Sequence, residues 1–116
     1  MIKKITIVLV GFFLLGGCYY DKEDLLYPDA ANCTSLNSSF AVNVAPLIQS
    51  RCAVSGCHDA ASTNGPGPLT SYGQIKNAAV QIKSAVVSRF MPENSSLNLS
   101  EIKTISCWVD AGAKDN

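Results

Sequence analysis

Apolar residues recur at the spacing of a helix face in three segments of the chain, and the sequence shows no convincing strand pattern and no internal repeat. The first segment predicts a helix that begins after a cap at Asn43 and runs into Cys52. Its apolar face combines Val44 with Leu47 and Ile48, at positions i, i+3 and i+4. The fold is therefore expected to begin with a short helix that ends at a cysteine.

The second and third helical segments each open with a capping box, in which a polar cap residue and a Glu or Gln three positions later satisfy backbone N–H groups reciprocally. Ser71 and Gln74 open the second segment, whose helical period holds through Val87, so the pattern fits one helix or two. Asn98 and Glu101 open the third segment. The apolar side of the third segment consists of Ile102, Ile105, Trp108 and Val109.

Loops are predicted where Gly and Pro separate these helices. Residues 59–70 contain the run Asn-Gly-Pro-Gly-Pro at positions 64–68. Met91-Pro92 ends the second helical segment, and Gly112 ends the third. Together these signals predict an all-α domain.

The N-terminal segment is expected to be a targeting signal and not part of the fold. Two lysines precede an apolar run, Ile5–Leu15, which is too short to span a bilayer. The run ends in Leu-Gly-Gly-Cys, which resembles the lipobox of bacterial lipoproteins, in which the cysteine is lipidated. We therefore expect residues 1–17 to be a lipoprotein signal peptide and Cys18 to carry the lipid. An ordinary signal peptide and a buried apolar strand are the alternatives.

Removal of residues 1–17 would leave 99 of the 116 residues, enough for one small domain. Seven basic residues then face nine acidic ones, so the chain lacks the basic stripe that nucleic-acid binding requires. Residues 18–38 are acidic at their start and lack periodicity, so we expect a flexible, lipid-anchored tether. The acidic cluster resembles the surface-export signals of some Gram-negative lipoproteins, and a plain solvated linker is the alternative.

Cys57-His58 is the most informative pair in the chain. It ends the segment Cys-Ala-Val-Ser-Gly-Cys-His at residues 52–58, and a histidine directly after the second of two nearby cysteines is how c-type haem is attached. The usual spacing has two residues between the cysteines, whereas this segment has four. The spacer must therefore loop outward, and Ser55-Gly56 can supply the turn, because Gly accepts a positive φ. A disulfide between the two cysteines, beside a spare histidine, is the alternative.

Residues 39–116 resemble a small monohaem c-type cytochrome domain of the all-α kind, carried on a bacterial lipoprotein. The parts follow the order of that family: a helix, the Cys…Cys-His segment, a Gly/Pro loop ending Pro68-Leu69, a helix, Met91-Pro92 and a final helix. The resemblance covers about two-thirds of the chain. It implies a bundle of three to five short helices around one covalently attached haem.

The resemblance also implies how the haem is held, by Cys52, Cys57, His58, Pro68, Leu69 and Met91. His58, the only histidine, would bind the iron from one side, and Met91 from the other. Met91 is the only methionine left after the signal is removed, although a lone methionine after an apolar helix is more commonly core filler. The carbonyl of Pro68 would accept the Nδ1–H of His58, and Leu69 would pack on the haem face.

An iron closed by His and Met passes single electrons and has no open position for oxygen, so we expect an electron carrier and not an enzyme. Lys83 and Arg89 are candidates to pair with haem propionates, but they are more simply interpreted as solvated charges. Trp108 is expected in the core, and Phe40 and Phe90 in the core or the haem pocket.

Four cysteines remain once Cys18 is lipidated, and they permit three disulfide pairings, among which sequence cannot choose. If haem takes two of them, Cys33 and Cys107 are left, and a bridge is the usual outcome in an oxidising compartment. We expect a monomer in the Gram-negative cell envelope, on the periplasmic side or the cell surface, with a redox partner protein that the sequence does not identify. A haemless, disulfide-bonded binding or structural module and a small Cys/His metal-binding protein are the alternative functions.

Overall fold

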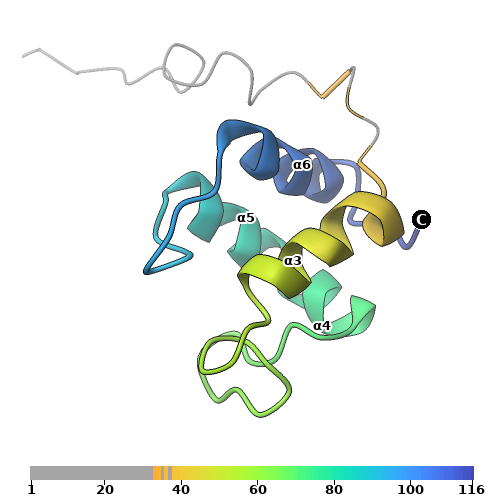
Figure 1. Ribbon diagram of the computed structural model, residues 1–116. Helices are drawn as coiled ribbons and strands as arrows, with labels where there is room; N and C mark the ends of the chain where they lie inside the picture. The colour runs from red at the N-terminus through yellow and green to blue at the C-terminus, as the bar shows by residue number, and fades with distance from the viewer. Residues whose placement is uncertain (1–32, 35, 37) are drawn as a thin grey trace, which may run out of the picture.

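The computed structural model describes residues 33–34, 36 and 38–116, and all the regular secondary structure in this part of the chain is helical (Figure 1). The all-α prediction is therefore confirmed for the described residues. The predicted signal peptide at 1–17, the predicted lipidation site Cys18 and most of the predicted tether at 18–38 lie outside them. No helix in the described part is long and apolar enough to cross a membrane.

The first helical unit begins earlier than the sequence predicts. A turn of π-helix, η1 (Phe40–Val44), leads directly into α3 (Ala45–Arg51). The cap is Ser39 and not Asn43, because the Ser39 hydroxyl accepts the N–H of Val42 at 3.4 Å. Asn43 reaches back instead, and its Oδ1 accepts the N–H of Ser39 at 2.9 Å. The two side chains thus satisfy backbone N–H groups reciprocally, as in a capping box.

The second segment forms two helices, α4 (Tyr72–Asn77) and α5 (Ala79–Val87). The predicted capping box of Ser71 and Gln74 is present at the start of α4. The break between the helices falls at Ala78, where φ is −95° and ψ is 3°. The apolar face continues across the break, and its buried members are Ile75, Ala78, Ala79, Ile82 and Val86.

The third segment forms α6 (Leu99–Asp110), which begins with the predicted capping box of Asn98 and Glu101. Gly112 follows the helix with φ of +98°, and the N–H of Ala113 returns to the carbonyl of Trp108 at 2.9 Å. This is the hydrogen bond of a Schellman motif, in which glycine accepts the left-handed conformation. The predicted end of the helix at Gly112 is therefore confirmed.

The core lies where α6 packs against η1 and α5 (Figure 1). Trp108 is 1% exposed, and its ring lies 5.6 Å from the ring of Phe40. The indole N–H donates to the carbonyl of Lys114 at 2.8 Å, so the polar end of this side chain is satisfied. Val44 and Ile48 are fully buried in the same cluster. The predicted core positions of Trp108 and Phe40 are confirmed.

Two links hold the ends of the described region to this core. Cys33 forms a disulfide with Cys107 of α6, the pair expected if the other two cysteines are engaged elsewhere. At the other end, the backbone carbonyl of Asn116 accepts the N–H of Ala41 at 2.9 Å, and its side-chain oxygen accepts the N–H of Phe40 at 2.9 Å. Because these N–H groups lie at the start of η1 and have no partner within the helix, the C-terminal residues complete its cap.

Candidate functional site

The segment after α3 folds into a turn that returns the chain to Cys52. The N–H of His58 donates to the carbonyl of Cys52 at 3.0 Å. Inside the spacer, the N–H of Cys57 donates to the carbonyl of Val54 at 3.0 Å, and Gly56 has φ of +80°. Any other residue would be strained at that φ. The outward loop that a four-residue spacer requires is therefore present, and it turns at the predicted glycine.

His58 is 7% exposed, and its imidazole is fixed in one orientation. Nδ1 lies 3.0 Å from the carbonyl oxygen of Gly67. A carbonyl can only accept, so Nδ1 carries the proton and Nε2 keeps the lone pair that can bind a metal. The backbone adds a second link, because the N–H of Leu69 donates to the carbonyl of His58 at 2.9 Å.

The expected acceptor of this imidazole bond, the carbonyl of Pro68, is wrong by one residue. The structure assigns the role to Gly67, which has φ of +102°. Glycine adopts this left-handed conformation easily, and the direction of the chain at Gly67 brings its carbonyl to His58. The Gly/Pro loop therefore holds the histidine as expected, but through the glycine.

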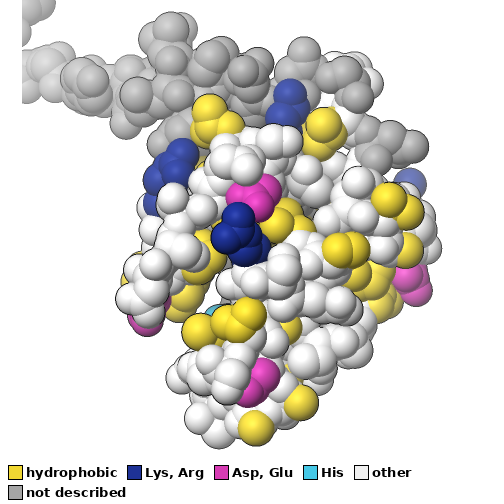
Figure 2. All heavy atoms as spheres, viewed as in Figure 1, with side chains coloured by type: hydrophobic (Ala, Val, Ile, Leu, Met, Phe, Trp, Pro, Cys, Tyr) yellow, Lys and Arg dark blue, Asp and Glu magenta, His cyan; other side chains and the backbone are white. Residues whose placement is uncertain are grey.

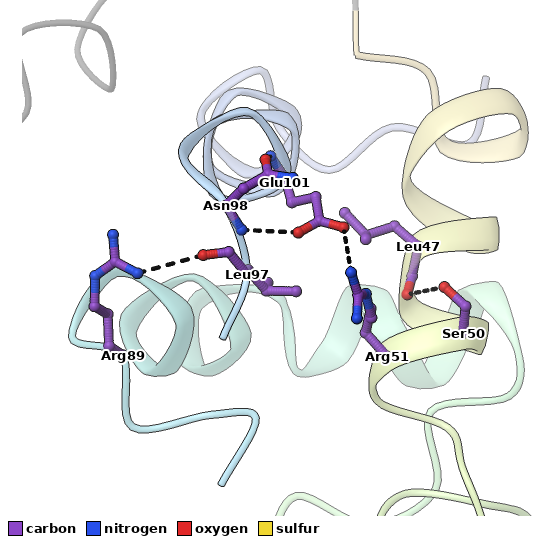
Figure 3. Close-up of polar contacts among 7 residues, drawn as sticks. All are labelled: Leu47, Ser50, Arg51, Arg89, Leu97, Asn98 and Glu101. Carbon is purple, nitrogen blue, oxygen red and sulfur yellow. Dashed lines mark hydrogen bonds and ion pairs between the residues drawn. The ribbon is translucent and has the colours of Figure 1, made fainter. Parts of the chain in front are cut away.

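Met91 is positioned by the end of α5. Arg89 adopts a left-handed conformation with φ of +58°, and the N–H groups of Phe90 and Met91 both donate to the carbonyl of Ala85, at 2.9 and 3.2 Å. The guanidinium of Arg89 donates to the carbonyl of Leu97 at 3.3 Å and closes the following loop (Figure 3). Met91 therefore begins a loop whose start and end are both held to the helical body.

Two adjoining hollows share four lining residues, namely Cys52, His58, Gly65 and Met91. The larger has a volume of about 490 Å³ and lies between the 52–65 segment and residues 91–95. Figure 2 shows a hollow between these two loops, with apolar side chains along its sides. His58 and Met91, which are 33 residues apart in sequence, therefore line the same space.

The smaller hollow has a volume of about 310 Å³ and extends along α5. Its wall is mainly apolar and includes Leu69, Ile82, Val86 and Phe90. Leu69 is 3% exposed, whereas Phe90 is 68% exposed at the edge of the hollow, so Phe90 belongs to the pocket and not to the core. Pro68 is not among the residues that line either hollow.

The two cysteines beside the histidine are free thiols in different environments. Cys57 is exposed, whereas Cys52 is buried at the end of α3. Burial raises the pKa of the Cys52 thiol to about 11, and the neighbouring Cys57 contributes to the rise. A buried thiol of high pKa is a poor nucleophile at neutral pH, so Cys57 is the more accessible of the two.

The charged residues near the site are largely paired with the protein itself. Arg51 lines the larger hollow and contacts the carboxylate of Glu101 at 3.2 Å, and the other oxygen of Glu101 accepts the N–H of Asn98 at 2.8 Å (Figure 3). Lys83 contacts Asp110 at 2.6 Å. Neither Lys83 nor Arg89, whose contact is to a backbone carbonyl, lines either hollow.

Sequence reasoning missed two residues, Asn64 and Ser62, whose side chains contact the Cys-His turn. The side-chain amide of Asn64 donates to the carbonyls of Gly56 and Cys57, at 3.3 and 3.1 Å. The hydroxyl of Ser62 donates to the same Cys57 carbonyl. The Asn-Gly-Pro run predicted a loop here, but nothing in the sequence of this loop predicts that it contacts residues 56–57.

Among the described residues, no group of three or more His, Cys, Asp or Glu side chains is placed to hold a metal ion.

Comparison with known proteins gives no relative from which a role could be taken. No protein-family model matches the chain, and neither the curated proteins nor the solved structures contain a match.

Proposed function

We propose that the protein is a membrane-anchored electron carrier that holds one c-type haem covalently. Cys52 and Cys57 would carry the two thioether bonds, and His58 and Met91 would bind the iron. The observation that carries the proposal is that Cys52, His58 and Met91 line one space, with the histidine fixed so that Nε2 is its free nitrogen.

The residues present fit such a group. A haem needs an apolar slot, and the two hollows form a continuous lining in which Leu69, Ile82 and Val86 supply apolar contact. It also needs two reduced thiols near one histidine, and both Cys52 and Cys57 are free. A carbonyl that accepts from Nδ1 fixes the tautomer of the ring and its orientation.

When bound, the group would supply one-electron redox chemistry. The chain's own residues set the conditions for it. If Met91 binds the iron, its thioether would act as a soft ligand that favours the ferrous state and raises the reduction potential. The loop that begins at Met91 and the turn at 52–58 face each other across the larger hollow, so they would limit the access of water to the site. The exposed Phe90 leaves one apolar edge open to a partner.

The haemless module remains the alternative. It accounts for the disulfide Cys33–Cys107 equally well. It gives no role to the free thiols at Cys52 and Cys57, nor to the buried, oriented imidazole of His58.

The test is to express the protein with a cytochrome c maturation system and stain for haem after denaturing electrophoresis. The wild-type protein should be red and keep its haem, and the double variant Cys52→Ser/Cys57→Ser should retain none. The variant Ser55→Ala is the matched control, because it changes an exposed residue of the same spacer, keeps both thiols and the disulfide, and should keep its haem. A colourless wild-type protein from a competent host would refute the proposal.

A further inference from the structure

The hydrogen bonds around Asn64 form a closed circuit with the Cys57-His58 pair. The Asn64 side chain donates to the carbonyl of Cys57 at 3.1 Å, and the backbone carbonyl of Asn64 accepts the N–H of Gly67 at 2.5 Å. The carbonyl of Gly67 accepts from Nδ1 of His58 at 3.0 Å. Because His58 is bonded to Cys57, the circuit returns to its start. One residue is thus linked to the position of the second thiol and to the orientation of the imidazole.

The direction of the side-chain bonds is determined by chemistry. Both partners of the Asn64 side chain, at Gly56 and Cys57, are carbonyl oxygens. Only the NH₂ end of the amide can donate to them, so the orientation of the amide is fixed. The backbone N–H of Asn64 donates to the Ser62 hydroxyl at 3.2 Å, and that hydroxyl itself donates to Cys57. The carbonyl of Cys57 therefore receives two side-chain donors.

We propose that Asn64 is a positioning residue, one that holds the longer Cys-Cys spacer in the shape needed to present both the Cys57 thiol and the His58 imidazole. A four-residue spacer has more conformations than a two-residue one. Contacts from residues outside the spacer are therefore needed to fix its conformation. The Asn64 amide supplies this constraint by fixing the two consecutive carbonyls that precede His58. The proposal rests on the proposed function for the meaning of the site, but the constraint itself is a property of the chain.

The test compares three variants of the full-length protein as isolated: Asn64→Ala, Asn64→Asp and the control Thr63→Ala. Thr63 is an exposed residue of the same loop and lines neither hollow. The first readout is hydrogen exchange at the amides of Cys57 and His58, which close the turn. Loss of the Asn64 side-chain hydrogen bonds should speed the exchange of these two amides on the order of fivefold. The amides of α6 should be unchanged.

The ranking of the two Asn64 variants separates a donor role from simple space filling. Asp has the shape of Asn but presents a carboxylate to two carbonyl oxygens, which repel it. The amides of Cys57 and His58 should therefore exchange faster in Asn64→Asp than in Asn64→Ala. If Asn64 only fills space, Asn64→Asp should match the wild-type protein. The second readout is the share of haem bound through one thioether, read from the ferrous α-band and from alkylation of Cys57, and it should rise in the same order.

Each outcome has a distinct meaning. Wild-type exchange rates at Cys57 and His58 in both Asn64 variants would overturn the positioning role. Equal acceleration of exchange in Thr63→Ala would also overturn it. A wild-type chain that carries no haem would refute the proposed function, whereas the exchange ranking would still decide the role of Asn64.

Discussion

Removal of the disulfide between Cys33 and Cys107 should cost a large part of the stability of the domain. The two residues are 74 positions apart, so the bridge closes a loop that contains nearly the whole fold. In the chain-entropy description a loop of this length is worth about 4.5 kcal/mol at 25 °C. Small domains have free energies of unfolding of about 5–15 kcal/mol, so the bridge is a major contribution.

The cleanest perturbation is Cys33→Ala, because Cys33 is only partly buried whereas Cys107 is 3% exposed in the core. Guanidinium unfolding followed by far-UV circular dichroism should show a free energy of unfolding lower by about 3–4.5 kcal/mol. Cys107→Ala removes the same bridge and also leaves a cavity in α6, so it should be destabilised further. A loss below about 1 kcal/mol in Cys33→Ala would refute the reasoning.

Four further predictions test the site and the core. Met91→Ala should keep its haem but show a lower reduction potential and new binding of carbon monoxide, and an unchanged spectrum and potential would mean that Met91 does not bind the iron. In the chain made without haem, Cys52 should be alkylated about 100-fold more slowly at pH 8 than in urea, because a pKa of about 11 in place of 9.0 leaves few thiolates. The free energy of unfolding of the haem-free chain should fall as the pH rises from about 9 to about 11, because the Cys52 thiol ionises first in the unfolded chain. A flat profile would contradict the raised pKa of Cys52. Ile105→Ala, at a fully buried position of α6, should lose about 2–5 kcal/mol in guanidinium unfolding, and a loss below about 1 kcal/mol would contradict its place in the core.

The helix starts that sequence predicted correctly are those encoded locally. The capping boxes at Ser71 and Asn98 each need only a residue three positions later, and both are present. The start of the first helix was misplaced because its cap is partly non-local: the hydroxyl of Ser39 donates to Asn116, 77 residues away, at 2.7 Å. The break at Ala78 carries no Gly or Pro to mark it, so the apolar period alone could not reveal it.

In the candidate site, too, the features encoded locally were predictable and those set by the path of the loop were not. The turn at Gly56 was predictable, because the spacer needed a positive φ and only one residue in it accepts one easily. Whether Gly67 or Pro68 accepts the hydrogen bond from His58 depends on the path of the 59–70 loop, which residue types alone do not determine. The contacts of Asn64 depend on the same path. Sequence therefore indicated the residues of the candidate site, while the path of the loop decides which residues hold them in place.

The central claim is that Cys52 and Cys57 are joined to haem, and intact-mass spectrometry of the denatured, unreduced wild-type protein tests it most directly. Treatment with an alkylating agent before the measurement reports any thiol that remains free. We predict a mass increased by one haem, with no alkylation at Cys52 or Cys57. A haem-free mass, with these two cysteines either alkylated or joined in a disulfide, would contradict the account.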